Sequence, residues 1–275
     1  MKTKQRHPLI VGTFILTATG IVSRLIGFLY RIYLSRMFGE EGMGIYQLLS
    51  PVLSLSFSLT AAGYQTAISK LVAEQTATSR KPSLRPLALG LLVSLPLSLA
   101  CNGVLFFFAD QVSASLLQEP RTASMLRILS FSVPLSAVHS CINGYFYGIK
   151  KAGIPAGAQL LEQIARVGCV YIVSSRILAA GGTPSISVAV LGLTVGELAS
   201  MLFTIAAICP GGLSSLSQIR SLPQRRSSRA QGLPQRLSHG ALSCATRMSS
   251  GNAALWGKLM AMALPLTANR IVLNL

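Results

Sequence analysis

The sequence predicts an all-α protein, a polytopic bundle of transmembrane helices, and three observations lead to that prediction. Hydrophobic residues make up 51% of the 275 residues and charged residues only 11%, whereas about a quarter of the residues in a soluble domain are charged. Six apolar stretches are long enough to cross a bilayer, and a seventh begins near Leu259. Basic residues occur on every second connection between these stretches, as is typical of cytoplasmic loops.

The apolar stretches divide the chain into three regions. Residues 1–209 hold the six complete spans, at about 8–30, 43–69, 87–108, 124–148, 154–179 and 186–209. Residues 210–258 are rich in Ser, Arg, Gly and Pro, and we expect a basic cytoplasmic linker that is partly disordered. This linker is either a solvated connection touching anionic headgroups or a ligand gate. Residues 259–275 start a seventh, truncated helix, so we expect the front half of a longer protein or a truncated product of one.

The net charge is +17, and the positions of the basic residues along the chain indicate how the protein is oriented in the membrane. Lys2, Lys4 and Arg6 precede the first stretch, and Lys150 and Lys151 lie in the fourth connection. The intervening connections are poor in base or balanced by acid. This pattern predicts a multi-pass protein of the cell (plasma) membrane with its N-terminus in the cytoplasm, and it disfavours a nucleic-acid partner.

One face of the first stretch is polar and cationic. Its members follow one another at spacings of 4, 3, 4, 3 and 4, which places them on one side of a helix: Thr13, Thr17, Gly20, Arg24, Gly27 and Arg31. A charged residue at this depth faces a bundle interior or a water-filled cavity, or else its long side chain snorkels to the interface. We favour the cavity, with Arg24 and Arg31 binding a polar, anionic substrate, because the small and polar residues share the face of the arginines.

The later spans carry further charged residues. Glu162 and Arg166 are spaced i, i+4 and form either a cytoplasmic gate or a mutually neutralised ion pair. Glu197 has no basic residue within a turn, so it is protonated, in water, or paired with a base from another helix. Arg24 and Arg270 are the candidate partners, and a role for Glu197 in transport or proton coupling is one interpretation.

A second cationic position lies in the last stretch. Arg270 follows Pro265 and is preceded by Asn269, near the expected midplane of the bilayer. With Arg24 it can form a cationic pocket, because guanidinium groups bind phosphate oxygens bidentately. His139, in the fourth span, is either a group that titrates near neutral pH or a satisfied interior histidine.

The sequence contains none of the common signatures of an enzyme. The five cysteines form no CxxC pair, and we find no P-loop and no grouping of Ser, His and Asp. We therefore predict no catalytic residue, no metal site and no cofactor.

Five short motifs occur in order along nearly the whole chain. They are Ser23-Arg24-Leu25-Ile26-Gly27-Phe28, Ala67-Ile68-Ser69-Lys70-Leu71-Val72-Ala73-Glu74, Gly144-Tyr145-Phe146-Tyr147-Gly148, Glu162-Gln163-Ile164-Ala165-Arg166 and Pro265-Leu266-Thr267-Ala268-Asn269-Arg270. Together they resemble the stage V sporulation protein B group of polysaccharide-biosynthesis transporters, in the multidrug/oligosaccharidyl-lipid/polysaccharide (MOP) exporter superfamily. The resemblance implies about fourteen helices in two halves around a cavity, as in MATE and lipid-flippase folds, with this chain as the first half. In the lipid II flippases the arginine matching Arg24 lines the cavity, so the resemblance implies that role here.

The residues and the resemblance lead to one main hypothesis and two alternatives. The main hypothesis is a flippase for a polyprenyl-pyrophosphate-linked saccharide, such as a peptidoglycan (lipid II) precursor for the cell wall or spore cortex. Its partners would be that lipid, the bilayer and a missing C-terminal half. The alternatives are a cation-coupled multidrug exporter of the same superfamily, and a non-transporting scaffold or truncated remnant.

Overall fold

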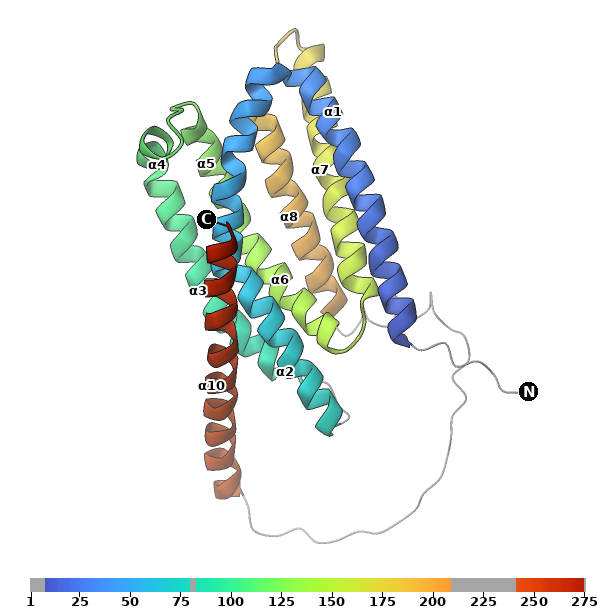
Figure 1. The fold of residues 1–275 in the computed structure, drawn as a ribbon, viewed down its shortest axis with the longest axis vertical. Coiled ribbons are helices and arrows are strands. Elements are labelled where there is room, and N and C mark those ends of the chain that lie inside the picture. Colours follow the sequence, from blue (N-terminus) through green and yellow to red (C-terminus); the bar gives the residue numbers. More distant parts are fainter. Residues whose placement is uncertain (1–7, 80–82, 209–240, 275) are drawn as a thin grey trace, which may run out of the picture.

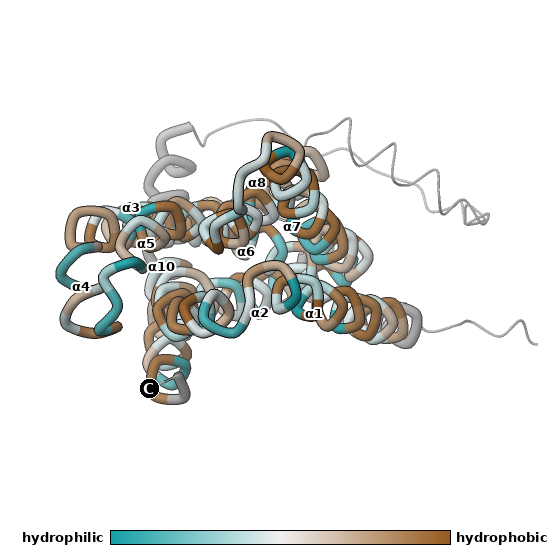
Figure 2. The backbone as a smooth tube through the Cα atoms, turned by 90° about the horizontal axis from the view of Figure 1, so that it is seen from above, coloured by the Kyte–Doolittle hydropathy of each residue, from teal (hydrophilic) through white to brown (hydrophobic). Residues whose placement is uncertain are grey.

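The computed structural model describes residues 8–79, 83–208 and 241–274, and in these ranges it contains helices and no strands. The expected N-terminal basic residues and residues 210–240 of the expected linker lie outside the described residues. Seen from above, the helices form two rows (Figure 2). One row holds α1, α2 and α10, and the other holds α3, α5, α6, α7 and α8.

The first helix, α1 (Pro8–Phe57), consists of two antiparallel segments that meet at Gly39 (Figure 1). Gly39 has φ 69° and ψ −173°, a conformation that glycine adopts without a Cβ clash. The second segment continues through the π-helix η1 (Ser58–Ala62) into α2 (Gly63–Ser79). The predicted span 43–69 therefore corresponds to parts of three elements.

The fourth predicted span is divided in two. After α3 (Arg85–Phe107) and the short α4 (Ala109–Ser115), the chain forms α5 (Thr122–Ser130) and α6 (Ser132–Gly148), with a break at Phe131. Pro134 explains the break, because its ring clashes with the carbonyl of residue i−4, which is Ser130.

The last helices are α7 (Gly153–Ala179), α8 (Ser187–Ile208) and α10 (Ala241–Asn274). The helix expected to begin near Leu259 thus begins at Ala241, inside the range assigned to the linker. Hydropathy detects only the apolar part of this helix, whereas residues 241–258 contain no proline and can continue the same helix in water.

Within the described residues, four helical segments are long and apolar enough to cross a membrane, namely Gly12–Ala77, Arg85–Phe107, Thr122–Gly148 and Ser187–Ile208. The first of them contains the reversal at Gly39. α7 and α10 are not among them, because charged residues such as Arg166 and Arg270 lower their hydropathy. Large apolar side chains on the outside of the bundle are exposed, including Phe14, Leu25 and Phe107, as expected for surfaces that face lipid.

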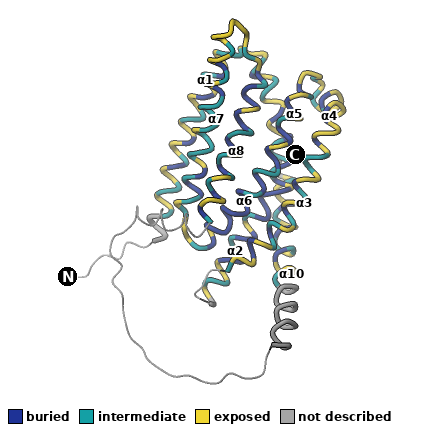
Figure 3. The backbone as a smooth tube through the Cα atoms, turned by 180° about the vertical axis from the view of Figure 1, so that it is seen from behind, coloured by how far each residue is buried: buried dark blue, intermediate teal, exposed yellow. Residues whose placement is uncertain are grey.

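Glycine contacts bring the helices of the second row together. In α8, Gly192 and Gly196 are four residues apart and face α7, where a Cβ on Gly196 would lie 2.9 Å from the Glu162 carbonyl oxygen. Small residues at this spacing allow helix backbones to approach closely in membranes. Among the helices in the described residues, α6 is the most enclosed, as the dark blue trace in Figure 3 shows, and it contacts α2 of the first row as well as α3 and α8 of its own row.

A surface ion pair joins the Gly39 turn to the segment between α4 and α5. Arg121 Nη1 lies 2.6 Å from Glu41 Oε1, and the side chains are 69% and 79% exposed. Exposed pairs contribute little, since solvent screens the charges and the side chains lose rotamer entropy. Arg121→Ala is therefore expected to lower the free energy of unfolding by less than about 1 kcal/mol, measured by detergent denaturation. A larger loss would contradict this assignment.

Candidate functional site

Three arginines from two helices line one cavity of about 440 Å³. Arg24 and Arg31 come from the first segment of α1, and Arg166 comes from α7. We call it the arginine cavity. The remaining lining residues are Ser23, Gly27, Phe28, Tyr30, Leu34, Met43, Tyr46, Gln159 and Gln163. Arg24, Gly27 and Arg31 are the members of the predicted stripe that reach it.

Several buried polar atoms at this cavity have no hydrogen-bond partner in the protein. They include Ser23 Oγ, Tyr30 OH, Gln163 Oε1 and Arg166 Nε. Buried polar groups are nearly always satisfied by protein, water or ligand. A polar cavity of this size suits ordered water or a polar headgroup, so the arrangement indicates a wet hollow rather than a hydrophobic core.

A buried cluster of charged residues lies beside the arginine cavity. We define it as His139 of α6, Glu162 and Arg166 of α7, and Glu197 of α8. His139 Nε2 lies 2.7 Å from Glu197 Oε2, and Arg166 forms an ion pair with Glu162. One ligand-type atom each of His139, Glu162 and Glu197 lies within 4.8 Å of the others.

The partner of Glu197 was predicted wrongly. The sequence suggested Arg24 or Arg270, whereas the structure pairs Glu197 with His139, which lies 58 residues earlier in the chain. Helical periodicity identifies the face on which a residue lies, but it does not identify the helix that packs against that face. The Glu162–Arg166 ion pair, in contrast, was predicted from its spacing and is present.

A second, smaller cavity reaches the cluster from the side of Glu197. It measures about 230 Å³ and is lined by Ser50, Leu53, Ser54, Phe57, Val133, Ser136 and Glu197. We call it the serine cavity. The buried cluster thus extends between two hollows, with Arg166 at the arginine cavity and Glu197 at the serine cavity.

Arg270 and Asn269 lie elsewhere. Both are exposed on α10 and neither lines the arginine cavity. α10 packs against α2, where a Cβ on Gly63 would lie 3.0 Å from the Ala263 carbonyl oxygen. Arg24 and Arg270 therefore do not form the predicted joint pocket. Arg166, instead of Arg270, lines the cavity together with Arg24.

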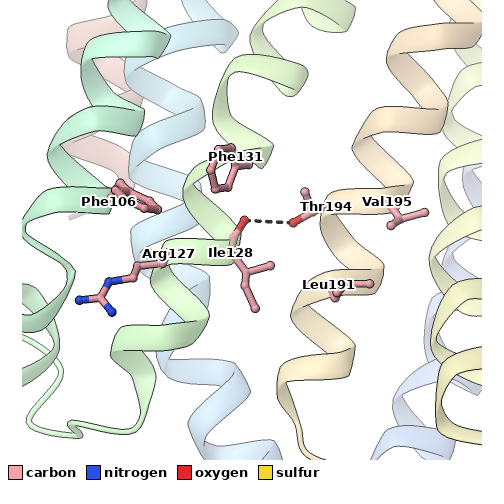
Figure 4. A pocket seen from close by; sticks show the side chains of 7 residues that line it. All are labelled: Phe106, Arg127, Ile128, Phe131, Leu191, Thr194 and Val195. Atoms are coloured by element: carbon pink, nitrogen blue, oxygen red, sulfur yellow. Dashed lines mark hydrogen bonds between the residues drawn. The ribbon is translucent and has the colours of Figure 1, made fainter. Parts of the chain in front are cut away.

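An apolar groove of about 420 Å³ lies between α3, α5 and α8, with Phe131 at the break between α5 and α6 (Figure 4). Phe106, Phe131 and Leu191 line it, and Thr194 Oγ1 donates a hydrogen bond of 3.3 Å to the Ile128 carbonyl. Its charged member, Arg127, forms an ion pair with Asp110 at 2.7 Å. The groove therefore offers a surface for acyl chains rather than a site for a polar ligand.

His139, Glu162 and Glu197 are residue types that also bind metals. Arg166 already supplies a positive charge next to Glu162, and a divalent cation would compete with this guanidinium. We therefore interpret the cluster as an ion-pair network.

Some residues of the site carried little signal in the sequence. Tyr30 and Tyr46 line the arginine cavity, yet aromatic residues are common on every face of a membrane helix. Ser50 and Ser54 line the serine cavity and are spaced i, i+4, a weak pattern that marks a shared face. Gln159 and Gln163, in contrast, are expected from the sequence to extend the polar face of Glu162 and Arg166, and both line the arginine cavity.

The helical fold, with segments apolar enough to cross a membrane, and the arginine cavity define a helical membrane protein with a cationic cavity between α1 and α7. The chain matches the family described as "Polysaccharide biosynthesis protein" over residues 9–224, and it belongs to that family. Among curated relatives, Stage V sporulation protein B of Bacillus subtilis (strain 168) is 36% identical over 193 residues. That alignment covers 70% of this chain and 37% of the relative.

A second relative is the Lipid II flippase MurJ of the same organism, 27% identical over 188 residues, which cover 62% of this chain and 32% of the relative. The chain thus spans about a third of the length of these relatives. This second relative is by name a flippase and not an enzyme, in agreement with the predicted class of protein.

Proposed function

We propose that this chain forms half of a flippase that moves a polyprenyl-pyrophosphate-linked saccharide across the cell membrane by alternating access. The observation that carries the proposal is the arginine cavity, where Arg24, Arg31 and Arg166 converge from two helices. The chain would supply six spans and part of a seventh, with its N-terminus in the cytoplasm, and a C-terminal half would complete the central cavity.

The chemistry of the cavity suits a pyrophosphate. Guanidinium groups bind phosphate oxygens bidentately, and each charge-assisted hydrogen bond contributes about 1.5–3 kcal/mol. Inserting an arginine into the centre of a membrane helix costs roughly 2.5–3.5 kcal/mol, so one or two such bonds offset the cost of each residue. Binding of an anion would therefore compensate the free-energy cost of having arginines at this depth in the membrane.

The relatives support the same substrate class. The name of one relative identifies it as a lipid II flippase, and lipid II carries its saccharide on a polyprenyl pyrophosphate. An exporter of cationic drugs fits less well, since cationic substrates require an acidic cavity. Glu162 and Glu197 are already engaged by Arg166 and His139.

Binding measurements on arginine variants test the proposal. Arg24→Gln and Arg31→Gln are each expected to weaken binding of farnesyl pyrophosphate to the chain in lipid nanodiscs by at least about tenfold, because tenfold corresponds to 1.4 kcal/mol. The matched control is Arg36→Gln, on the same helix but outside the cavity lining, which should bind as the parent chain does. Unchanged binding in both cavity variants, or an equal loss in the control, would contradict the proposed substrate class.

A further inference from the structure

The buried cluster has an unbalanced charge unless it holds a proton. Glu162 and Glu197 each contribute one negative charge and Arg166 contributes one positive charge. With a neutral imidazole on His139 the sum is −1, and with a protonated imidazole it is zero. The ion-paired side chains are only 11–17% exposed, and an uncompensated charge at such a site is strongly unfavourable because little water reaches it.

The hydrogen bonds of His139 fit the protonated state. The 2.7 Å contact between Nε2 and Glu197 Oε2 requires a proton between the two atoms. The other ring nitrogen, Nδ1, lies 3.4 Å from the Asn143 amide nitrogen, while Asn143 Oδ1 is buried without a partner. A half-turn of this amide, whose two ends have the same shape, would bring Oδ1 to accept from a protonated Nδ1.

The groups that face His139 come from several helices. α7 provides Glu162 and Arg166, and α8 provides Glu197. From α1, Tyr30 and Tyr46 are within electrostatic reach of Arg166. α6 itself adds the neutral Asn143, and it also carries Cys141, Tyr145 and Tyr147. Cys141 interacts with Tyr64 of α2. Arg166 is thus the cation that faces the cluster in the described part of the chain.

We propose that the buried cluster is a binding site for a single proton, carried on His139, and that this proton is linked through Arg166 to anion binding in the arginine cavity. With the proton bound, the positive charge of His139 compensates the negative charge of Glu197, and Arg166 is paired with the Glu162 carboxylate alone. Without the proton, both carboxylates attract the guanidinium and hold it away from the cavity. The proton site stands on the cluster alone, whereas its link to the anion rests on the proposed function.

The serine cavity provides a route for the proton. It brings Glu197 to a hollow that is also lined by the hydroxyl-bearing Ser50, Ser54 and Ser136. Hydroxyl groups both donate and accept hydrogen bonds, so water in this cavity can deliver a proton to the Glu197–His139 pair. The anion and the proton would then enter from opposite sides of the cluster.

The protonation of His139 can be read directly by nitrogen-15 NMR. The full chain carries three histidines, so the variant His7→Gln/His239→Gln, labelled with ¹⁵N-histidine in nanodiscs, reports His139 alone. At pH 7 we expect both ring nitrogens to show the signature of a charged imidazole. The added change Glu197→Gln should convert the spectrum to that of a neutral imidazole, whereas the matched surface change Glu41→Gln should leave it unchanged. A neutral imidazole before any change in the cluster would overturn the proton site.

A second arm tests the link to the anion. At a pH where His139 is half charged, farnesyl pyrophosphate should raise the charged fraction, because linkage between two sites is reciprocal. A saturating amount that leaves the fraction unchanged would overturn the link. Failure of farnesyl pyrophosphate to bind at all would instead contradict the proposed function, while the charged imidazole would still support the proton site.

Discussion

Replacing Arg166 with alanine is expected to destabilise the bundle by about 3–5 kcal/mol, the range for buried ion pairs that lose one partner. The change removes the one guanidinium that compensates Glu162, and the buried cluster then holds two carboxylates and one imidazole. The unpaired carboxylate would have to be neutralised or reached by water. Equilibrium unfolding in mixed micelles with increasing sodium dodecyl sulfate measures the change in free energy.

The double variant Glu162→Gln/Arg166→Gln separates charge from packing. Glutamine keeps most of the volume of both side chains and removes both charges, so this protein should regain most of the stability that Arg166→Ala loses. The control is Arg121→Ala, which breaks an exposed ion pair. Similar stability losses for Arg166→Ala and Arg121→Ala would show that Arg166 is well solvated, and the buried-cluster interpretation would fail.

The second large effect is expected at the contact between α2 and α6. A Cβ on Gly144 would lie 2.5 Å from the Gln65 carbonyl oxygen and 3.1 Å from its Cα. Both are backbone atoms, so the two helices must separate to admit a methyl group. Gly144→Ala is therefore expected to lower the free energy of unfolding by roughly 1–3 kcal/mol, the usual cost of overpacking.

A matched glycine on α7 should respond in the opposite direction. No atom lies within 4 Å of an ideal Cβ on Gly168. Gly168→Ala should therefore leave stability unchanged or raise it by up to about 1 kcal/mol, the difference in helix propensity. The same unfolding measurement compares the two variants, and equal effects at both sites would contradict the close approach of α2 and α6.

The sequence predicted the features that depend on local pattern. Apolar length identified the helical class, and the 3–4 spacing placed Arg24, Gly27 and Arg31 on one face, which the cavity now shares. The i, i+4 rule identified the Glu162–Arg166 pair. In each case the relevant neighbours are within one or two helical turns, where helix geometry fixes their relation.

Features that depend on which helices meet were not predictable in this way. Glu197 meets His139 because α8 packs against α6, and no periodicity along either helix encodes that contact. Arg270 was assigned to the cavity from its expected depth in the bilayer. Depth alone does not determine which side of the bundle its side chain faces. Its helix packs against α2 instead, and Arg166 is the third arginine of the cavity.

The separation of Arg270 from the arginine cavity changes the interpretation of the site. Arg166 belongs both to the cavity and to the buried cluster, so anion binding and the charge state of the cluster share one guanidinium. A pocket made from Arg24 and Arg270 would have had no such connection. Under the proposal above, the charge of the pocket can therefore respond to the neighbouring His139–Glu197 pair.

The central claim is that the polar face of the first helix borders water, and thiol accessibility tests it most directly. In a chain whose native cysteines are replaced, Gly27→Cys places a thiol in the arginine cavity without removing an arginine, and an added Cβ there meets no atom within 4 Å. Leu25→Cys lies at nearly the same depth but at a position on the outside of the bundle, where Leu25 is 58% exposed. In nanodiscs, a charged methanethiosulfonate reagent should modify Gly27→Cys quickly and Leu25→Cys slowly. Fast modification of Leu25→Cys with a protected Gly27→Cys would mean that the arginines face no aqueous cavity.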